Sequence, residues 1–269
     1  MKKPYLIALD LDGTLLKDNK TISRKTKELL FLAMQQGHHV CISTGRPYRS
    51  SSMYYKELGL RSPIVNFNGA FVHHPHDVSF GIHHSPLELE TAKRIIRTCE
   101  EFNVKNIMAE VIDDVYLKDH DEVIVSTFIM DQNPPQTGNL HHILNEDPTA
   151  LLIHPEDHHI GELRDHLEKM HAEVIDHRIW AAPWNIIEIV RTGMNKAVGL
   201  KKVADYYNVP RDRVIAFGDE DNDLEMIEYA GHGVAMGNAI PELKQLSNAV
   251  TETNERDGIA LYLKDVLNL

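Results

Sequence analysis

Strands and helices alternate at both ends of the chain, and this alternation limits the possible folds more than any other feature of the sequence. The apolar residues 6–9 predict a buried strand, and Ser23 is a suitable N-cap for a helix that ends near Gly37. Residues 40–43 then predict a second strand. A strand, a helix and a strand in this order favour a parallel sheet with a right-handed crossover.

The last part of the chain repeats the alternation. Residues 196–207 predict a helix, residues 214–217 a buried strand, and residues 233–235 another short strand. Further helices are expected at residues 224–229, from Pro241 onwards, and at residues 258–267. Both ends of the chain are therefore expected to belong to an α/β unit.

The segment between about residues 83 and 186 differs from both ends. It mixes helical with strand-like stretches, and nine of the 17 histidines fall between His120 and His177. We interpret this segment as a separate α+β insertion.

The composition argues against several classes of protein. The 40 acidic residues outnumber the 28 Lys and Arg, which gives a formal net charge of -12 with no run of bases, so nucleic acid or an acidic membrane surface is not expected as a partner. Only Cys41 and Cys99 are present, which does not indicate a disulfide framework. No apolar stretch approaches the roughly 18 residues of a membrane span, and Asp10 and Asp12 interrupt the start before a signal peptide could be complete. We expect a soluble, cytoplasmic protein.

Two polar motifs follow the predicted strands near the amino terminus. The sequence DLDGTL, residues 10–15, places the carboxylates of Asp10 and Asp12 where one could act as a nucleophile and the other as an acid or base. The sequence ISTGR, residues 42–46, supplies hydroxyls, a glycine and backbone N–H groups that can hold an anion. Taken alone, the first motif is also typical of a polar turn and the second of a capped helix start.

Two further motifs lie towards the carboxyl terminus. Lys196 stands where a helix is expected to begin, and a cation at that end opposes the helix dipole unless it has an anionic partner. The sequence GDEDND, residues 218–223, crowds acidic side chains after a strand, and such oxygen-only ligands suit Mg²⁺ better than zinc. Taken alone, Lys196 is also typical of a solvated surface lysine. The acidic run, taken alone, is also typical of a helix N-terminus.

Together the four motifs predict one site. In an open parallel sheet, ligands bind beyond the carboxyl ends of the strands, and three of the four motifs follow strands at that edge. Carboxylates about 4 Å apart repel by roughly 4 kcal/mol per pair at an effective dielectric of about 20, so a bound cation is needed to keep them ionised. Mg²⁺ and Lys196 would supply that charge and neutralise a phosphoryl group, while Thr44 and Asn222 hydrogen-bond its oxygens.

In their order and spacing the motifs resemble those of the haloacid dehalogenase-like phosphatases, specifically the Cof-type branch, over nearly the whole chain. The resemblance implies an α/β fold with a Rossmann-like parallel sheet and helices on both faces, formed by residues 1–82 and 187–269. It also implies an inserted α+β cap domain at residues 83–186. One position departs from the family, because Ala197 follows Lys196 where the family usually has Gly.

The resemblance also implies roles by position. Asp10 would be the nucleophile that forms an aspartyl-phosphate, and Asp12 the acid and base. The metal, Mg²⁺, would be held by acidic groups near both ends of the chain: the Asp10 side chain, the Asp12 backbone carbonyl and Asp219, with Glu220 and Asp223 nearby. The phosphate would be held by Leu11, Thr44, Gly45, Lys196 and Asn222. Arg46 would reach a substrate group or pair with a nearby acid.

The function expected from the resemblance is a Mg²⁺-dependent phosphatase acting on small phosphorylated metabolites, with sugar phosphates first. A bulky cap would exclude macromolecules from the site. Two alternatives use the same acidic residues: a phospho-acceptor signalling module and a phosphomutase. Asp12 argues against the signalling module, because an acid or base there would shorten the life of an aspartyl-phosphate. The sequence carries no signal for the oligomeric state.

Overall fold

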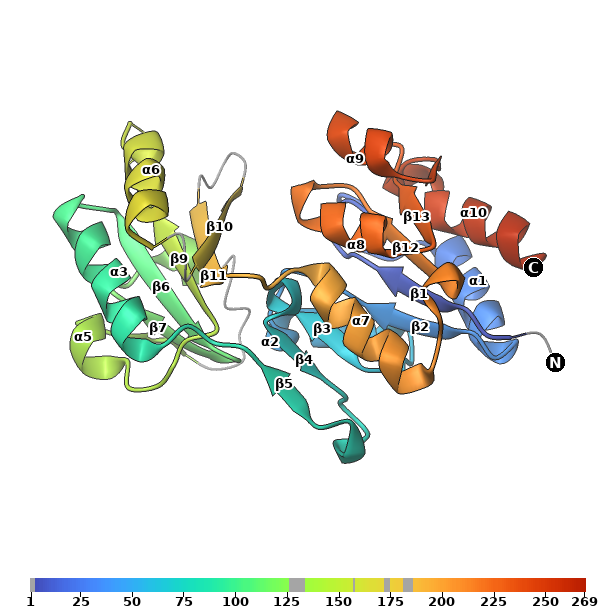
Figure 1. Cartoon of the computed structure of the whole chain (residues 1–269), viewed down its shortest axis with the longest axis horizontal. Helices are drawn as coiled ribbons and strands as arrows, with labels where there is room; N and C mark the ends of the chain where they lie inside the picture. Colours follow the sequence, from blue (N-terminus) through green and yellow to red (C-terminus); the bar gives the residue numbers. More distant parts are fainter. Residues whose placement is uncertain (1–2, 126–133, 157, 172–174, 181–185) are drawn as a thin grey trace. The chain divides into compact units, whose positions relative to one another are not determined.

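The computed structural model describes residues 3–125, 134–156, 158–171, 175–180 and 186–269 (Figure 1). Its contacts divide the chain into two compact units. The first unit consists of Met1–Arg46, Ser52–His83 and Asn195–Leu269, and the second of Pro47–Ser51 and His84–Met194.

The first unit is built on a parallel sheet of five strands in the order β14-β13-β12-β1-β2. The strands are β1 (Leu6–Leu9), β2 (His39–Ile42), β12 (Val214–Gly218), β13 (His232–Ala235) and β14 (Ala249–Val250). Leu6 pairs with Val214 on one side and with His39 on the other. Every residue of β1 and β12 is buried, as expected for central strands of a parallel sheet that is covered on both faces.

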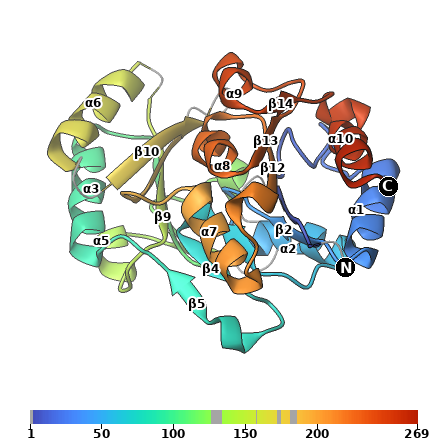
Figure 2. The same ribbon diagram turned by 45° about the vertical axis from the view of Figure 1, so that its right-hand side comes forward.

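Helices cover both faces of this sheet. Figure 2 shows α7 (Lys196–Tyr207) and α8 (Leu224–Tyr229) on one side of the strands, and α1 (Arg24–Gln35) and α10 (Gly258–Leu267) on the other. The remaining helices that include residues of this unit are α2 (Tyr48–Glu57) and α9 (Pro241–Leu246). Ser23 caps α1 as predicted, because its side chain accepts a hydrogen bond from the Thr26 N–H. The predicted α/β fold with a parallel sheet and helices on both faces is confirmed.

A smaller sheet, in which β3 and β4 pair antiparallel, continues the first unit. It has the order β3-β4-β5, formed by β3 (Ile64–Asn66), β4 (Phe71–His73) and β5 (Ile82–His84). A parallel bridge between Ser43 and Val65 joins β3 to the end of β2. These three strands were not predicted from the sequence, because each is only three residues long and carries no clear period.

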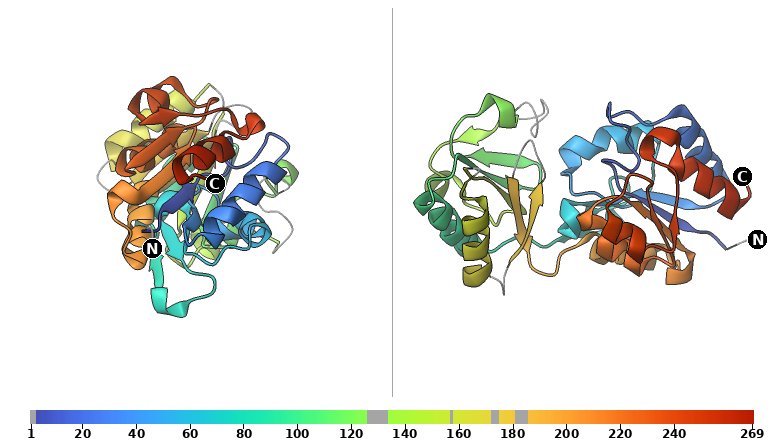
Figure 3. Two further views of the ribbon diagram at one scale, coloured as in Figure 1. Left: turned by 90° about the vertical axis from the view of Figure 1, so that its right-hand side faces the viewer. Right: turned by 90° about the horizontal axis from the view of Figure 1, so that it is seen from above.

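The second unit has a sheet of the order β10-β11-β9-β6-β7-β8, which is antiparallel except for the β7–β8 pair. Its strands are β6 (Asn106–Val111), β7 (Asp114–Leu117), β8 (Gln136–Thr137), β9 (Ala150–His154), β10 (Ile175–Trp180) and β11 (Ile186–Arg191). Its helices are α3 (Leu89–Glu101), α4 (Glu122–Ile124), α5 (Leu140–Ile143) and α6 (Ile160–His171). Figure 3 shows α3 and α6 on the same face of the sheet, where Ile95 and Leu163 pack in one apolar core with Ile107 and Ile189.

The boundaries between the units differ from the predicted 82/83 and 186/187. The chain enters the second unit after His83 and leaves it after Met194. The later exit follows from β11, which pairs with β9 and β10 and so belongs to the sheet of the second unit. The short segment Pro47–Ser51 also belongs there, because Arg49 forms a buried ion pair with Glu110. In the described part of the chain, no helix combines the length and the apolar character that crossing a membrane requires.

Candidate active site

Three of the predicted site residues lie at the carboxyl ends of neighbouring strands in the first unit. Asp10 directly follows β1, Thr44 comes two residues after the end of β2, and Asp219 directly follows β12. β1 lies between β2 and β12 in the sheet, so the three side chains start from one edge. In open parallel sheets, ligands commonly bind at this edge, beyond the carboxyl ends of the strands.

Lys196 reaches the same edge from the first turn of α7, which Asn195 caps by accepting a hydrogen bond from the Val198 N–H. The Lys196 side chain is fully buried, and its Nζ donates to Asp10 Oδ1 and to Asp223 Oδ1, both at 2.7 Å. Burial opposes the charge, but the two carboxylates raise the pKa of Lys196 above its ordinary value. These two partners offset the unfavourable position of the lysine at a helix N-terminus.

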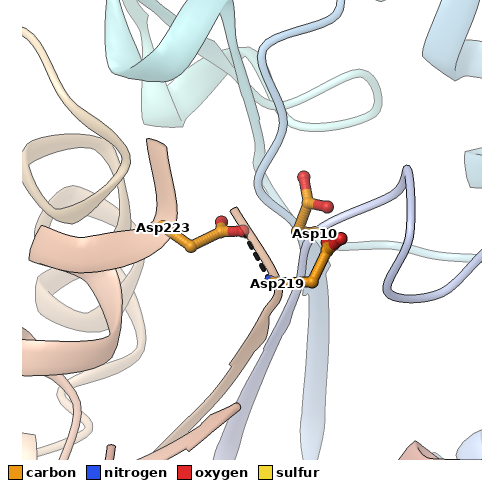
Figure 4. Close-up of side chains that lie close together, drawn as sticks. All are labelled: Asp10, Asp219 and Asp223. Carbon is orange, nitrogen blue, oxygen red and sulfur yellow. Dashed lines mark hydrogen bonds between the residues drawn. The ribbon is translucent and has the colours of Figure 1, made fainter. Parts of the chain in front are cut away.

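A cluster of three buried carboxylates includes both partners of this lysine. One oxygen from each of Asp10, Asp219 and Asp223 lies within 4.8 Å of the others, and all three side chains are buried (Figure 4). Burial, together with the charge of Asp223, raises the pKa of Asp219 to about 7. Burial raises the pKa of Asp10 well above its ordinary value even though Lys196 opposes the shift. One lysine therefore faces three acids, and this excess of negative charge on oxygen donors fits a hard divalent cation such as Mg²⁺.

The three carboxylates of the cluster differ in how many hydrogen bonds they already accept. Asp223 uses Oδ1 for Lys196 and Oδ2 for the backbone N–H groups of Asp219, at 2.9 Å, and Glu220, at 3.2 Å. In the described part of the chain, Asp10 Oδ2 accepts no hydrogen bond. Asp223 therefore shapes the acidic loop and holds the lysine, whereas Asp10 has an oxygen available for chemistry.

Asp219 is held by two residues that the sequence analysis did not identify. Thr14 Oγ1 donates to Asp219 Oδ1 at 2.7 Å, and Asn238 Nδ2 donates to Asp219 Oδ2 at 3.3 Å. Thr14 is part of the DLDGTL motif, so its position was a usable signal. Asn238 comes after β13 and lies outside the four motifs, so the folded sheet brings it to the site.

Glu220 does not join the cluster of three carboxylates found among the described residues. It is exposed, and its side chain accepts a hydrogen bond from the Asp223 backbone N–H in a capping box at residues 220–223. The geometry therefore gives Glu220 a local role in shaping the acidic loop.

Asp12 lies apart from the cluster and pairs with two cations. Arg46 Nε donates to Asp12 Oδ2 at 2.6 Å, Arg46 Nη2 donates to Oδ1 at 2.7 Å, and Lys20 Nζ donates to Oδ1 at 2.7 Å. Burial opposes ionisation, but Arg46 and Lys20 lower the pKa of Asp12 to about 2. In this conformation Asp12 is held as a carboxylate. Of the two roles expected for Arg46, the structure shows the pairing with a nearby acid.

The residues expected to hold phosphate surround the same edge. Leu11 and Thr44 are buried, and Thr44 Oγ1 accepts a hydrogen bond from the Arg46 N–H at 3.1 Å. Asn222 Nδ2 donates to Asn68 Oδ1 at 3.1 Å, and the Asn68 amide also lies against Gly45. Asn68 was not identified from the sequence, although the Asn68-Gly69 pair is a recognised turn signal.

A family model describing haloacid dehalogenase-like hydrolases matches residues 7–263 of this chain. The chain belongs to this family. The 5-amino-6-(5-phospho-D-ribitylamino)uracil phosphatase YitU of Bacillus subtilis is 58% identical over 267 residues, which cover 99% of both chains. YwtE of the same organism carries the same enzyme name and is 31% identical over 290 residues, covering 97% of this chain and 98% of the relative. A solved haloacid dehalogenase-like hydrolase from Bacteroides thetaiotaomicron superposes with a TM-score of 0.86 at 25% identity, covering 98% of this chain and all of the other.

This haloacid dehalogenase-like hydrolase is a phosphatase, that is, a phosphoric monoester hydrolase. The signalling module and the phosphomutase considered from the sequence are therefore set aside. The substrate in the name of YitU is a small phosphorylated metabolite, which is the class expected for this chain from its sequence.

Proposed function

We propose that this phosphatase hydrolyses 5-amino-6-(5-phospho-D-ribitylamino)uracil, with Mg²⁺, through an aspartyl-phosphate on Asp10. The substrate is supported by the relative YitU, which is named for this compound and is 58% identical over 99% of both chains. The resemblance seen in the sequence had favoured sugar phosphates as the substrate. The relative instead supports a phosphate ester on a ribityl chain that carries an aminouracil ring.

The observation that supports the chemistry is the buried Lys196, which bridges Asp10 and Asp223. Because Lys196 engages Asp10 Oδ1, Oδ2 is the oxygen that attacks phosphorus. The bond from phosphorus to the ester oxygen breaks as the new bond to Oδ2 forms. The leaving alkoxide takes a proton from Asp12, and the acyl phosphate remains on Asp10.

In the second step, Asp12 acts as a base and takes a proton from water, which then attacks the acyl phosphate. Inorganic phosphate leaves and the Asp10 carboxylate is restored. Asp12 enters this step as the carboxylate that the first step left, and without the Arg46 ion pair, which lowers its pKa, it is a stronger base. Its role as an acid in the first step requires that it takes up a proton when the substrate displaces that ion pair.

The remaining residues of the site neutralise and orient the phosphoryl group. Lys196 supplies a fixed positive charge, and Thr44, Gly45, Asn222 and the Leu11 backbone hold the phosphoryl oxygens. Asp10 and Asp219 would hold Mg²⁺ together with the Asp12 backbone carbonyl, and Asp223 and Glu220 would support the loop. When bound, the cation supplies charge neutralisation for the phosphoryl group and the carboxylates.

A substrate panel tests the proposed substrate. Purified enzyme with Mg²⁺ is assayed for phosphate release from 5-amino-6-(5-phospho-D-ribitylamino)uracil, sugar phosphates, flavin mononucleotide, nucleotides and pyridoxal phosphate. We expect kcat/KM for the first compound to exceed that of every other by at least about 10-fold, because specific polar contacts discriminate strongly between substrates. A higher kcat/KM for another member of the panel would reassign the substrate and leave the phosphatase chemistry intact.

Addition of Mg²⁺ to the metal-free enzyme is expected to raise its thermal unfolding midpoint. A cation that binds only the folded state stabilises it by about 2.7 kcal/mol at 100 times its Kd. Asp219→Asn is expected to remove most of this shift, because Asp219 is one of the two proposed side-chain ligands. Asp221→Asn removes the same charge from an exposed position of the same loop and is the matched control. A full Mg²⁺ shift in Asp219→Asn would contradict the proposed metal ligands.

A further inference from the structure

The turn formed by Asn66–Gly69 has a backbone conformation that is rare for its residues. It begins at the end of β3, and three successive residues have positive φ: Phe67 at 49°, Asn68 at 50° and Gly69 at 94°. A positive φ is tolerated by Asn and Gly but is unfavourable for an aromatic residue such as Phe67. Asn66 and Phe67 are fully buried and Asn68 is 1% exposed. Such strain persists only where surrounding contacts enforce it, and it concentrates at functional sites.

The turn holds the backbone of the loop that follows β2. Asn66 Nδ2 donates to the Arg46 carbonyl at 2.8 Å, and the Asn68 backbone N–H donates to the Thr44 carbonyl at 3.2 Å. A Cβ added to Gly45 would lie 3.2 Å from Asn68 Nδ2, so the Asn68 amide packs closely against this glycine. The turn therefore contacts each residue of the TGR motif.

The same turn contacts the acidic loop and the start of α7. Asn68 Oδ1 accepts the 3.1 Å hydrogen bond from Asn222 Nδ2. A Cβ added to Gly69 would lie 2.2 Å from the Asn195 carbonyl, so only glycine allows the turn to approach the residue that caps α7. α7, which begins with Lys196, packs beside β3 and this turn (Figure 1).

We propose that Asn68 is a positioning residue for the phosphoryl site. Its backbone N–H fixes the Thr44 carbonyl, and its side-chain oxygen takes one N–H of the Asn222 amide. This contact orients the Asn222 amide so that its second N–H is available to a phosphoryl oxygen. Asn68 thus sets the distance between the two phosphate-holding loops without touching the substrate. The inference rests on the phosphate-holding roles proposed for Thr44 and Asn222.

Asn68→Gly tests the inference, because glycine adopts φ near 50° and the substitution removes only the side-chain amide. We expect kcat/KM for p-nitrophenyl phosphate to fall about 10-fold, the effect of losing one well-placed hydrogen bond. The inhibition constant of inorganic phosphate is expected to rise by a similar factor. Asn208→Gly is the matched control, since Asn208 has φ 53° and lies exposed at the C-cap of α7. That variant should retain wild-type kinetics.

A double-mutant cycle separates positioning from a general effect on the fold. If Asn68 acts through Asn222, then Asn68→Gly causes little further loss of kcat/KM in an Asn222→Ala background. Multiplicative losses in the double variant, or wild-type kinetics in Asn68→Gly, would overturn the inference. If wild-type enzyme releases no phosphate from any ester, the proposed function fails instead, so the two failures are distinguishable.

Gly45→Ala keeps the inference testable if Asn68→Gly does not fold. The added Cβ would lie 3.2 Å from Asn68 Nδ2 and 3.3 Å from Asn68 Oδ1, which is close enough to push the amide aside by a fraction of an ångström. We expect its loss of kcat/KM to be smaller in an Asn222→Ala background than in wild type. Equal losses in both backgrounds would overturn the inference.

Discussion

Asp10→Asn is expected to lower phosphatase turnover by at least about 10³-fold, because an amide oxygen cannot replace the carboxylate that attacks phosphorus. The substitution preserves the shape of the side chain, and its Oδ1 can still accept the hydrogen bond that Lys196 now donates at 2.7 Å. It also replaces the buried Asp10 carboxyl, whose pKa lies well above its ordinary value, with a neutral amide. The variant should therefore fold as stably as wild type.

The measurement pairs phosphate release with thermal unfolding for wild type, Asp10→Asn and Asp221→Asn. Asp221 lies exposed in the acidic loop, so its neutralisation controls for loss of one negative charge near the site. Asp221→Asn should retain near-normal turnover. Acid-quenched wild type incubated with labelled substrate should carry phosphate that hydroxylamine releases, and Asp10→Asn should carry none. Near-normal turnover in Asp10→Asn would show that another group is the nucleophile.

The elements of the first unit could be predicted where the signal is local. The strand at Leu6–Leu9 and the helices at Lys196–Tyr207 and Gly258–Leu267 were predicted with the observed bounds. A short apolar run, a capping residue and a glycine or proline act within a few residues, so the sequence alone reports them. The common edge of Asp10, Thr44 and Asp219 then followed from the geometry of parallel strands.

The rest depends on contacts between distant segments. The strand Ile186–Arg191 is as apolar as a core strand, and only its pairing with β9 assigns it to the second unit. The contact between Asn68 and Asn222 joins residues that are far apart in sequence, and nothing local indicates it. The pairing of Asp12 with Arg46 depends on side-chain conformations, which motif spacing does not determine. The motifs thus located the side chains that cluster at the sheet edge, Asp10, Lys196 and Asp219, but did not indicate Asn68 and Asn238, which contact this site.

Lys196→Met is expected to lower kcat/KM by about 10²- to 10³-fold, the usual effect of removing one donor to a developing negative charge. Methionine nearly matches the length of lysine and leaves no large cavity, so the lost charge dominates the outcome. Because Lys196 would stabilise the transition state, the loss should appear in kcat. A change confined to KM would contradict this role.

The same substitution should destabilise the enzyme when Mg²⁺ is absent. Breaking a buried ion pair by removing one partner costs about 3–5 kcal/mol, and here two fully or nearly buried carboxylates, Asp10 and Asp223, lose their shared cation. Lys201→Met is the matched control on the same helix, since Lys201 forms only a solvent-exposed i,i+4 pair with Asp205, and such pairs contribute little to stability.

A second substitution separates the two contributions of Lys196. Asp223→Asn added to Lys196→Met removes one of the uncompensated buried charges, so the unfolding midpoint should partly recover. Activity should not recover, because the positive charge beside the phosphoryl group is still missing. If kcat returned together with stability, Lys196 would be acting only by holding the acidic loop in place. If neither recovered, repulsion between the buried carboxylates would not explain the instability of the single variant, and the account of Lys196 as their shared counter-charge would be wrong.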